Sequence, residues 1–225
     1  MATSPPKKET QVSLHLKAYT EIRRRILSGE LSAESPLSEH QLAVELELSR
    51  TPVREAVKRL EREGLVRSIP NRGTFVAELT ARDISEIYQV REQLEKFAAR
   101  IAAERMSDEG IEMIEEEIVL SNKLASEGLM VEIVDSDIRL HKLIIASTQN
   151  SRLIAVLATL DDQMYRVRAL FPQSSQWLEA TLVEHATIVE AIKAHDGPRA
   201  EKAMEAHLRS SREHAVRRSL PVDYF

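Results

Sequence analysis

The sequence predicts a mainly α-helical protein, with an N-terminal winged helix-turn-helix followed by an antiparallel all-α bundle of about six helices. Two observations predict this class. The 225 residues are 43% hydrophobic and 30% charged with only six glycines, which is typical of a folded, helix-rich chain. Apolar residues recur at helical spacing along most of the chain, and one segment, residues 65–79, changes to short runs of branched and aromatic residues.

The distribution of charge indicates two domains with different partners. Residues 1–79 carry 13 Lys and Arg against 11 Asp and Glu, whereas residues 80–225 carry 18 against 25. A mildly basic first part joined to an acidic remainder is typical of a chain whose parts contact different molecules. We therefore expect a disordered tail over residues 1–11, a first domain over 12–79 and a second domain over 80–225.

The composition also indicates in which cellular compartment the protein is expected. The chain contains no cysteine, which excludes disulfides and thiolate metal sites and agrees with a reducing cytoplasm. Its first letters, MATSPPKKETQ, lack the apolar core of a signal peptide. No run approaches the roughly 18 apolar residues that a membrane span needs. We expect a cytoplasmic protein with no membrane partner.

The first third of the chain predicts three short helices. Ile22 and Ile26 recur at helical spacing and predict the first helix over about 14–28. Ser38 is followed three residues later by Gln41, which is a capping-box signature, so the second helix should begin there.

The third helix is predicted from the letters SRTPVREAVKRLEREGLV. Ser49 or Thr51 is the expected N-cap, because both side chains can accept a hydrogen bond from a free backbone N–H. Pro52 falls in the first turn, where its missing N–H costs nothing. Gly64 is expected to end the helix shortly after Glu63.

Residues 65–79 predict a β-hairpin. The runs Leu65–Ile69 and Thr74–Leu79 are short and rich in branched or aromatic residues, and the letters PNRG between them form a turn. Three short helices followed by a hairpin make a winged helix-turn-helix within about 65 residues.

Beyond Thr80 the pattern is helical throughout. Connections as short as the ones predicted here place neighbouring helices antiparallel. We predict six helices, over residues 83–104, 108–126, 131–148, 151–170, 175–195 and 198–218.

The third predicted helix has a buried face beside an outward basic stripe. Four apolar residues lie within about 100° of one another on a helical wheel and face the three-helix core: Val53, Ala56, Val57 and Leu60. Arg50, Arg54 and Lys58 lie on the adjoining stripe and must point outward. Such a helix suits the major groove of DNA, where an arginine can bind guanine O6 and N7.

Other polar groups complete the predicted DNA-binding set. The N-terminal amides of the second and third helices favour phosphate. Glycine at the hairpin tip permits close backbone approach, and its arginine neighbour can reach the minor groove or a phosphate. A solvated basic stripe on a surface helix is the alternative interpretation. Besides the three stripe residues, the set comprises Ser38, Ser49, Thr51, Arg72, Gly73 and Thr74.

This part of the chain resembles the GntR family of bacterial transcription regulators. The letters LSEHQLA, LSRTPVREAVKRLEREGLV and NRGTFV carry the resemblance, over roughly residues 12–78. It implies binding to a double-stranded operator through Arg50, Arg54 and the wing at Arg72 and Gly73. It adds His40, near the start of the second helix, where relatives often have an arginine.

Three histidines and one aspartate form a second constellation. Asp137 and His141 are four residues apart, so both side chains leave the same face of one helix. His185 and His207 lie in the middle of two other helices with apolar neighbours three or four residues away. Three helices that bring these four side chains into a bundle centre would make a divalent metal site, for which zinc is expected and nickel is possible. Hydrogen-bonded structural histidines are the alternative.

Residues 80–225 resemble the FCD effector domain of the FadR branch of that family. The letters IYQVREQLEKFAARIAAE, DSDIRLHKLIIASTQNSRL, EHATIVEAIKAHD and AEKAMEAHL carry the resemblance. It implies a divalent metal held by Asp137, His141, His185 and His207. Six predicted helices, rather than seven, resemble the VanR-type subgroup.

Arginines are the candidate effector-binding residues. By the same resemblance, Arg91 faces the cavity beside the metal and pairs with an effector carboxylate, and the alternative for it is a surface salt bridge with Glu95. Arg166 and Arg168 in MYRVRAL are further candidates. The remaining histidines, His15, His195 and His214, are expected at the surface.

The sequence as a whole predicts a metal-containing, metabolite-responsive transcription regulator and not an enzyme. One winged domain makes too few contacts for operator-level affinity, so we expect a homodimer that reads a near-palindromic operator. By family habit it is a repressor that a small organic acid releases, and it joins the nucleoid when bound. A metal-dependent hydrolase and a ligand-free architectural DNA-binding protein are the alternatives.

Overall fold

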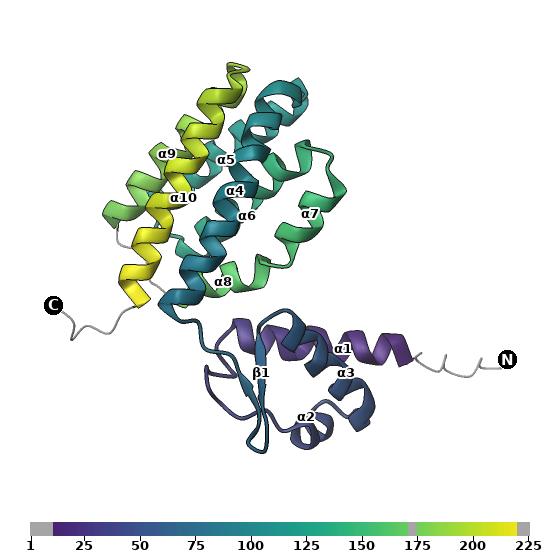
Figure 1. Ribbon diagram of the computed structural model, residues 1–225. Helices are drawn as coiled ribbons and strands as arrows, with labels where there is room; N and C mark the ends of the chain where they lie inside the picture. Colours follow the sequence, from purple (N-terminus) through teal and green to yellow (C-terminus); the bar gives the residue numbers. More distant parts are fainter. Residues whose placement is uncertain (1–10, 171–174, 220–225) are drawn as a thin grey trace, which may run out of the picture. The chain divides into compact units, whose positions relative to one another are not determined.

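The chain divides into two compact units, with the boundary between Leu79 and Thr80 (Figure 1). The computed structural model describes residues 11–170 and 175–219. Residues 1–10 of the expected tail lie outside that description. Gln11, which we assigned to the tail, is the first residue of a helix.

The first unit contains three helices and a two-stranded sheet. These are α1 (Gln11–Leu27), α2 (Glu39–Glu45), α3 (Arg50–Arg62), β1 (Val66–Ile69) and β2 (Gly73–Val76). The Ser38 hydroxyl accepts a hydrogen bond from the Gln41 N–H at 3.2 Å, which confirms the predicted start of α2. Ser49 is the N-cap of α3, although its side chain makes no capping hydrogen bond. Gly64 has φ +73° and takes the chain out of α3.

The wing is a true antiparallel hairpin, shorter than predicted at its open end. The register pairs Val66 with Val76 and Ile69 with Gly73. A third segment supports β2, because the Leu37 N–H donates to the Thr74 carbonyl at 2.8 Å. The apolar residues of all three helices and of both strands close over one core that includes Ile22, Val53 and Leu60.

The second unit is a helical bundle. Its helices, as described within residues 80–170 and 175–219, are α4 (Ala81–Arg105), α5 (Asp108–Glu127), α6 (Met130–Ser147), α7 (Ser151–Ala158), α8 (Asp161–Leu170), α9 (Ser175–Lys193) and α10 (Gly197–Ser219). α4 and α10 lie side by side over much of their length (Figure 1). Fully buried alanines on α4, including Ala98 and Ala102, allow this close approach.

The single helix predicted over residues 151–170 is wrong, because the structure has two helices there. α7 ends at Ala158, with Thr159 as its C-cap, and α8 begins with Asp161 and Asp162, whose charges favour a helix N-terminus. Apolar spacing continues through the break, which is why periodicity alone gave one helix. The described part of the second unit therefore has seven helices, and the helix count no longer supports the six-helix subgroup.

No helix within the described ranges 11–170 and 175–219 combines the length and apolar character that crossing a membrane requires.

Candidate nucleic-acid interface and metal centre

Helix α3 presents the basic stripe that its sequence predicts. Val53, Ala56 and Leu60 have no exposed surface and fix this helix on the core of the first unit. Arg50, Thr51, Arg54 and Lys58 are all exposed. Arg54 and Lys58 lie 3.9 and 3.2 Å from the exposed Glu55, and exposed pairs of this kind are weak. Their charges are therefore accessible to a polyanion.

The other predicted DNA-binding residues also lie at accessible positions of the first unit. Ser38, His40 and Ser49 are exposed around the N-termini of α2 and α3. At the wing tip Arg72 and Gly73 are exposed, and Gly73 has φ +105° with open space where a Cβ would lie. Thr74 is half-buried, because it belongs to β2 and pairs with Ser68.

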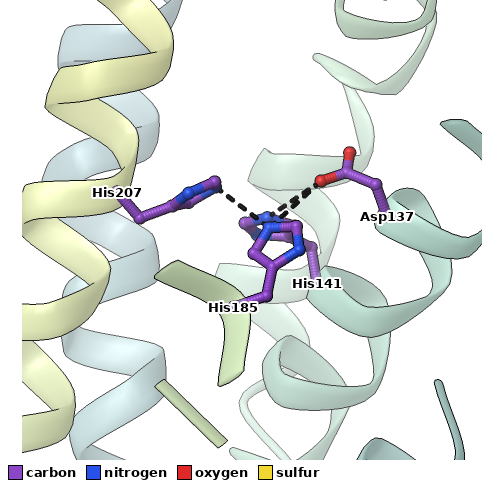
Figure 2. Close-up of side chains that lie close together, drawn as sticks. All are labelled: Asp137, His141, His185 and His207. Carbon is purple, nitrogen blue, oxygen red and sulfur yellow. Dashed lines mark hydrogen bonds and ion pairs between the residues drawn. The ribbon is translucent and has the colours of Figure 1, made fainter. Parts of the chain in front are cut away.

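The four predicted metal ligands meet in the centre of the second unit. Asp137 and His141 come from α6, His185 from α9 and His207 from α10 (Figure 2). One potential ligand atom from each residue lies within 4.8 Å of all the others. His141, His185 and His207 are only 4%, 2% and 3% exposed. Residues 70 positions apart in the chain are thus gathered into one enclosed polar cluster.

The contacts within the cluster point inward. His185 Nε2 lies 3.3 Å from both His207 Nε2 and Asp137 Oδ1. His141 Nε2 lies 3.6 Å from Asp137 Oδ1, is buried, and has no hydrogen-bond partner among residues 11–170 and 175–219. A buried ring nitrogen without a partner costs about 1–3 kcal/mol, so the cluster is unfavourable by itself.

Two carboxylates lie behind the histidines and orient them. His141 Nδ1 lies 2.5 Å from Glu95 Oε2, and His207 Nδ1 lies 2.9 Å from Glu184 Oε2. A protonated Nδ1 that donates to a carboxylate leaves the Nε2 lone pair facing the centre, which is the arrangement typical of metal-binding histidines. The donor set and its orientation therefore fit a divalent cation.

Protonation agrees with that fit. Burial lowers the pKa of His141, and burial together with the neighbouring His185 and His141 holds the pKa of His207 well below its usual value. Burial alone would raise the pKa of Asp137, but Arg168 and the hydrogen bond from His185 hold it well below its usual value. Two neutral imidazoles and an ionised carboxylate at neutral pH can bind a metal without first losing protons.

Sequence reasoning missed the orienting carboxylates. The sequence suggested Glu95 only as the partner of Arg91 in a surface salt bridge. The salt bridge forms, but it is buried and not at the surface. The Arg91 Nε donates to Glu95 Oε1 at 2.5 Å, and both side chains are buried. Burial alone would raise the pKa of Glu95, but Arg91 and His141 lower it to about 2. Glu184 had no signal beyond its place next to His185.

The three candidate effector arginines lie in different surroundings. Arg91 lines two cavities of the second unit, and Arg168 lines both of these and a third. Arg168 Nη2 lies 2.5 Å from Asp137 Oδ2. Arg166 is buried and lines none of these three cavities, so the structure does not bring it to them, and its burial lowers its pKa.

One of the histidines that we expected at the surface is partly buried. His214 is half-buried, and its ring stacks on Trp177 with 4.8 Å between the ring centroids. It follows His207 by two turns of α10, so it lies on the same side of that helix. His195 is exposed as expected, and His15 is half-buried in α1.

Comparisons with known proteins agree with both units. The family of bacterial regulatory proteins named gntR matches residues 14–76, and the FCD domain matches residues 86–210. The chain is 28% identical over 201 residues to the HTH-type transcriptional regulator YdhC of Bacillus subtilis strain 168, covering 89% of this chain and 90% of that protein.

A second relative and a solved structure extend the likeness. The gluconate operon transcriptional repressor of Bacillus licheniformis is 28% identical over 197 residues, covering 85% of this chain and 81% of its own. The crystal structure of a GntR-type transcriptional regulator from Rhodococcus sp. RHA1 has the same fold, with a TM-score of 0.74 at 21% identity, covering 90% of this chain and 97% of its own. The chain belongs to the GntR family of bacterial regulatory proteins, and its second unit is an FCD domain.

Proposed function

We propose that this protein is a metal-containing repressor that binds a near-palindromic operator as a homodimer and is released by a small organic acid. One observation carries the proposal. A buried cluster of Asp137 and three histidines, oriented by carboxylates and bordered by Arg168, lies in the same chain as an exposed recognition helix. Operator binding and ligand sensing thus each have a site of suitable chemistry.

The DNA contacts are assigned from exposure and chemistry. Arg50 and Arg54 read base edges in the major groove, since a guanidinium can bind guanine through two bonds. Lys58, Thr51 and the helix N-termini near Ser38, His40 and Ser49 hold phosphates. Arg72, Gly73 and Thr74 belong to the wing and contact the adjacent backbone or minor groove.

The metal is held by Asp137, His141, His185 and His207. Nitrogen and carboxylate ligands suit zinc, with nickel as the alternative. When bound, the cation supplies positive charge that attracts an acidic ligand, and it ties α6, α9 and α10 together. Arg168 borders this site and binds the ligand carboxylate, while Arg91 holds Glu95 and through it His141.

Dimerisation is assigned to an apolar stripe on α4. Val90 and Phe97 are 46% and 45% exposed, and Leu94 and Ile101 are half-buried at the positions between and after them. Spacings of four, three and four residues place all four on one face of the helix. Two copies that pair through this face would bring two winged domains to two half-sites.

Repression is the mode of action that the relatives support. The Bacillus licheniformis relative is named as a repressor of an operon, and the chain matches it over most of both lengths. A ligand that binds one arrangement of the dimer better than another shifts the population and so changes operator affinity.

Operator binding with defined metal content tests the proposal. The full chain is stripped with a chelator, reloaded with zinc, and used to select binding sequences from a random DNA pool. We expect a near-palindromic site, and we expect His185→Ala/His207→Ala protein to lose metal by elemental analysis. Stoichiometric metal in that double variant, or selection of no shared sequence, would contradict the proposal.

A further inference from the structure

Arg168 and Trp177 line two cavities of contrasting chemistry in the FCD domain. The apolar cavity is lined chiefly by Met130, Ile133, Val134, Leu178 and Leu182. The polar cavity is lined chiefly by Tyr88, Arg91, Ser211 and His214. Asp137, Arg168 and Trp177 line both cavities. A molecule bound at Arg168 is therefore adjacent to both cavities.

His214 supplies an unused hydrogen-bonding group in the polar cavity. Its Nε2 is buried and has no hydrogen-bond partner within the described residues. Its ring is held against Trp177 by stacking, so its direction is fixed. Burial, followed by the nearby Arg218 and Arg217, lowers its pKa, so the ring is neutral at neutral pH. A buried neutral nitrogen of this kind is satisfied by a ligand hydroxyl.

Arg168 supplies the anion-binding group where the cavities meet. Its ion pair with Asp137 involves Nη2, and a guanidinium has five N–H donors, so donors remain for a ligand carboxylate. Arg91 and Glu95 neutralise each other, as do Arg168 and Asp137. A divalent cation held by the histidines would add two positive charges, and Glu184 would offset only one of them. The net charge of the site would then be positive, which favours an anionic ligand.

We propose that the ligand is an organic carboxylate with an apolar body and a hydroxyl group. Its carboxylate binds Arg168, its apolar body fills the apolar cavity, and its hydroxyl hydrogen-bonds to His214 Nε2 in the polar cavity. This assignment rests on the proposed function, in which an organic acid is the effector. Sugars lack the apolar body, simple fatty or aromatic acids lack the hydroxyl, and neutral alcohols lack the anion.

Trp177 is the only tryptophan of the chain and reports directly on both cavities. Zinc-loaded full-length protein is titrated, with tryptophan fluorescence as the readout, against benzoate, 4-hydroxybenzoate, hexanoate, 6-hydroxyhexanoate, benzyl alcohol and gluconate. We expect at least one hydroxy acid to bind about three- to tenfold more tightly than its unsubstituted partner, the factor typical of one hydrogen bond. Benzyl alcohol and gluconate should bind more weakly than that hydroxy acid and its unsubstituted partner.

Three variants test the assigned residues. His214→Phe keeps an aromatic ring against Trp177 but removes the nitrogen, so it should abolish the preference for the hydroxy acid while the unsubstituted acid still binds. Arg168→Gln should weaken every acid at least tenfold. Arg152→Gln, at an exposed position of α7, is the matched control. It should change neither the affinity for the acids nor the preference for the hydroxy acid. Metal content and melting temperature show that each variant is folded.

The outcomes separate this assignment from the proposed function. No binding by either hydroxy acid, or a preference that persists in His214→Phe, would overturn the ligand assignment. If a hydroxy acid binds as expected but does not change operator affinity, release by an effector fails while the ligand assignment stands. If an acid releases the operator without any dependence on His214, the proposed function stands and this assignment fails.

Discussion

Single side chains in this protein combine ordinary local patterns with unusual surroundings. Asp137 and His141 are an i, i+4 pair such as many exposed helices carry, yet here they meet two histidines from distant helices. Glu95 orients His141 and Glu184 orients His207 toward the centre. The chemistry of the site is therefore set by pairs of residues, one that faces the centre and one that orients it.

Replacement of Glu184 by Gln should weaken zinc binding about 10–100-fold, the range typical of lost orienting partners of metal-bound histidines. The His207 Nδ1 would lose its carboxylate partner, so its Nε2 would be less basic and less well oriented. Competition with a fluorescent zinc chelator gives the affinity. Glu179→Gln, exposed on the same helix, serves as the control and should bind zinc like the parent. Equal affinities for both variants would show that Glu184 has no part in the site.

Replacement of Arg54 by Ala should cost roughly 1–3 kcal/mol of discrimination between the selected operator and random duplex. Lys58→Ala should instead weaken both duplexes alike and reduce the dependence of affinity on salt. Fluorescence anisotropy at several salt concentrations measures both effects. Arg62→Ala, exposed at the other end of α3, is the matched control. Unchanged discrimination in Arg54→Ala would remove the base-reading role.

At the scale of elements, five helices of the second unit contribute to the candidate site. α6, α9 and α10 carry the proposed metal ligands, α4 carries Glu95, and α8 brings Arg168 to all three cavities. The break between α7 and α8 makes α8 a separate helix, and this helix carries Arg168, the proposed anion-binding residue. α4 also has an outward face, which carries the apolar stripe.

Replacement of Phe97 by Glu should dissociate the homodimer at micromolar concentration, since it places a charge in the centre of the stripe on α4. Val119→Glu is the matched control, because Val119 is 70% exposed on α5 and lies outside the stripe. Analytical ultracentrifugation measures the mass of each variant. Operator affinity should fall with the dimer. A dimeric Phe97→Glu protein would move the interface to another face.

At the scale of the whole molecule, two compact units divide the work of one regulator. The first has a continuous apolar core and exposed basic residues, and the second encloses a polar cluster in its centre. Burying such a cluster is costly unless its groups are satisfied. If the proposed cation binds there, it offsets that cost, and the stability of the second unit should then depend on metal while that of the first should not.

Removal of the metal by a chelator should lower the melting temperature of the second unit and leave the first unchanged. Binding to the folded state alone stabilises it by about 2.7 kcal/mol when free metal is 100-fold above the dissociation constant. Differential scanning calorimetry with and without chelator measures the change, and His185→Ala/His207→Ala protein should show none. A chelator effect of equal size in that double variant would place the metal elsewhere.

The sequence by itself determined the class of the fold and the positions of most helices, because these follow from local spacing. The Ser38 cap with Gln41, the start of α3 at Pro52 and its end at Gly64 each depend on only a few neighbouring residues. The four candidate ligands could also be named in advance, although for His185 and His207 the decisive argument was resemblance.

Only the tertiary structure decided which side chains meet. That Glu95 lies behind His141, that Arg168 and not Arg166 faces the cavities, and that His214 stacks on Trp177 all depend on helices distant in sequence. The same holds for the break before Asp161, where apolar spacing continues although the chain turns. Spacing determines which face of a helix a residue occupies, whereas packing determines what that face contacts.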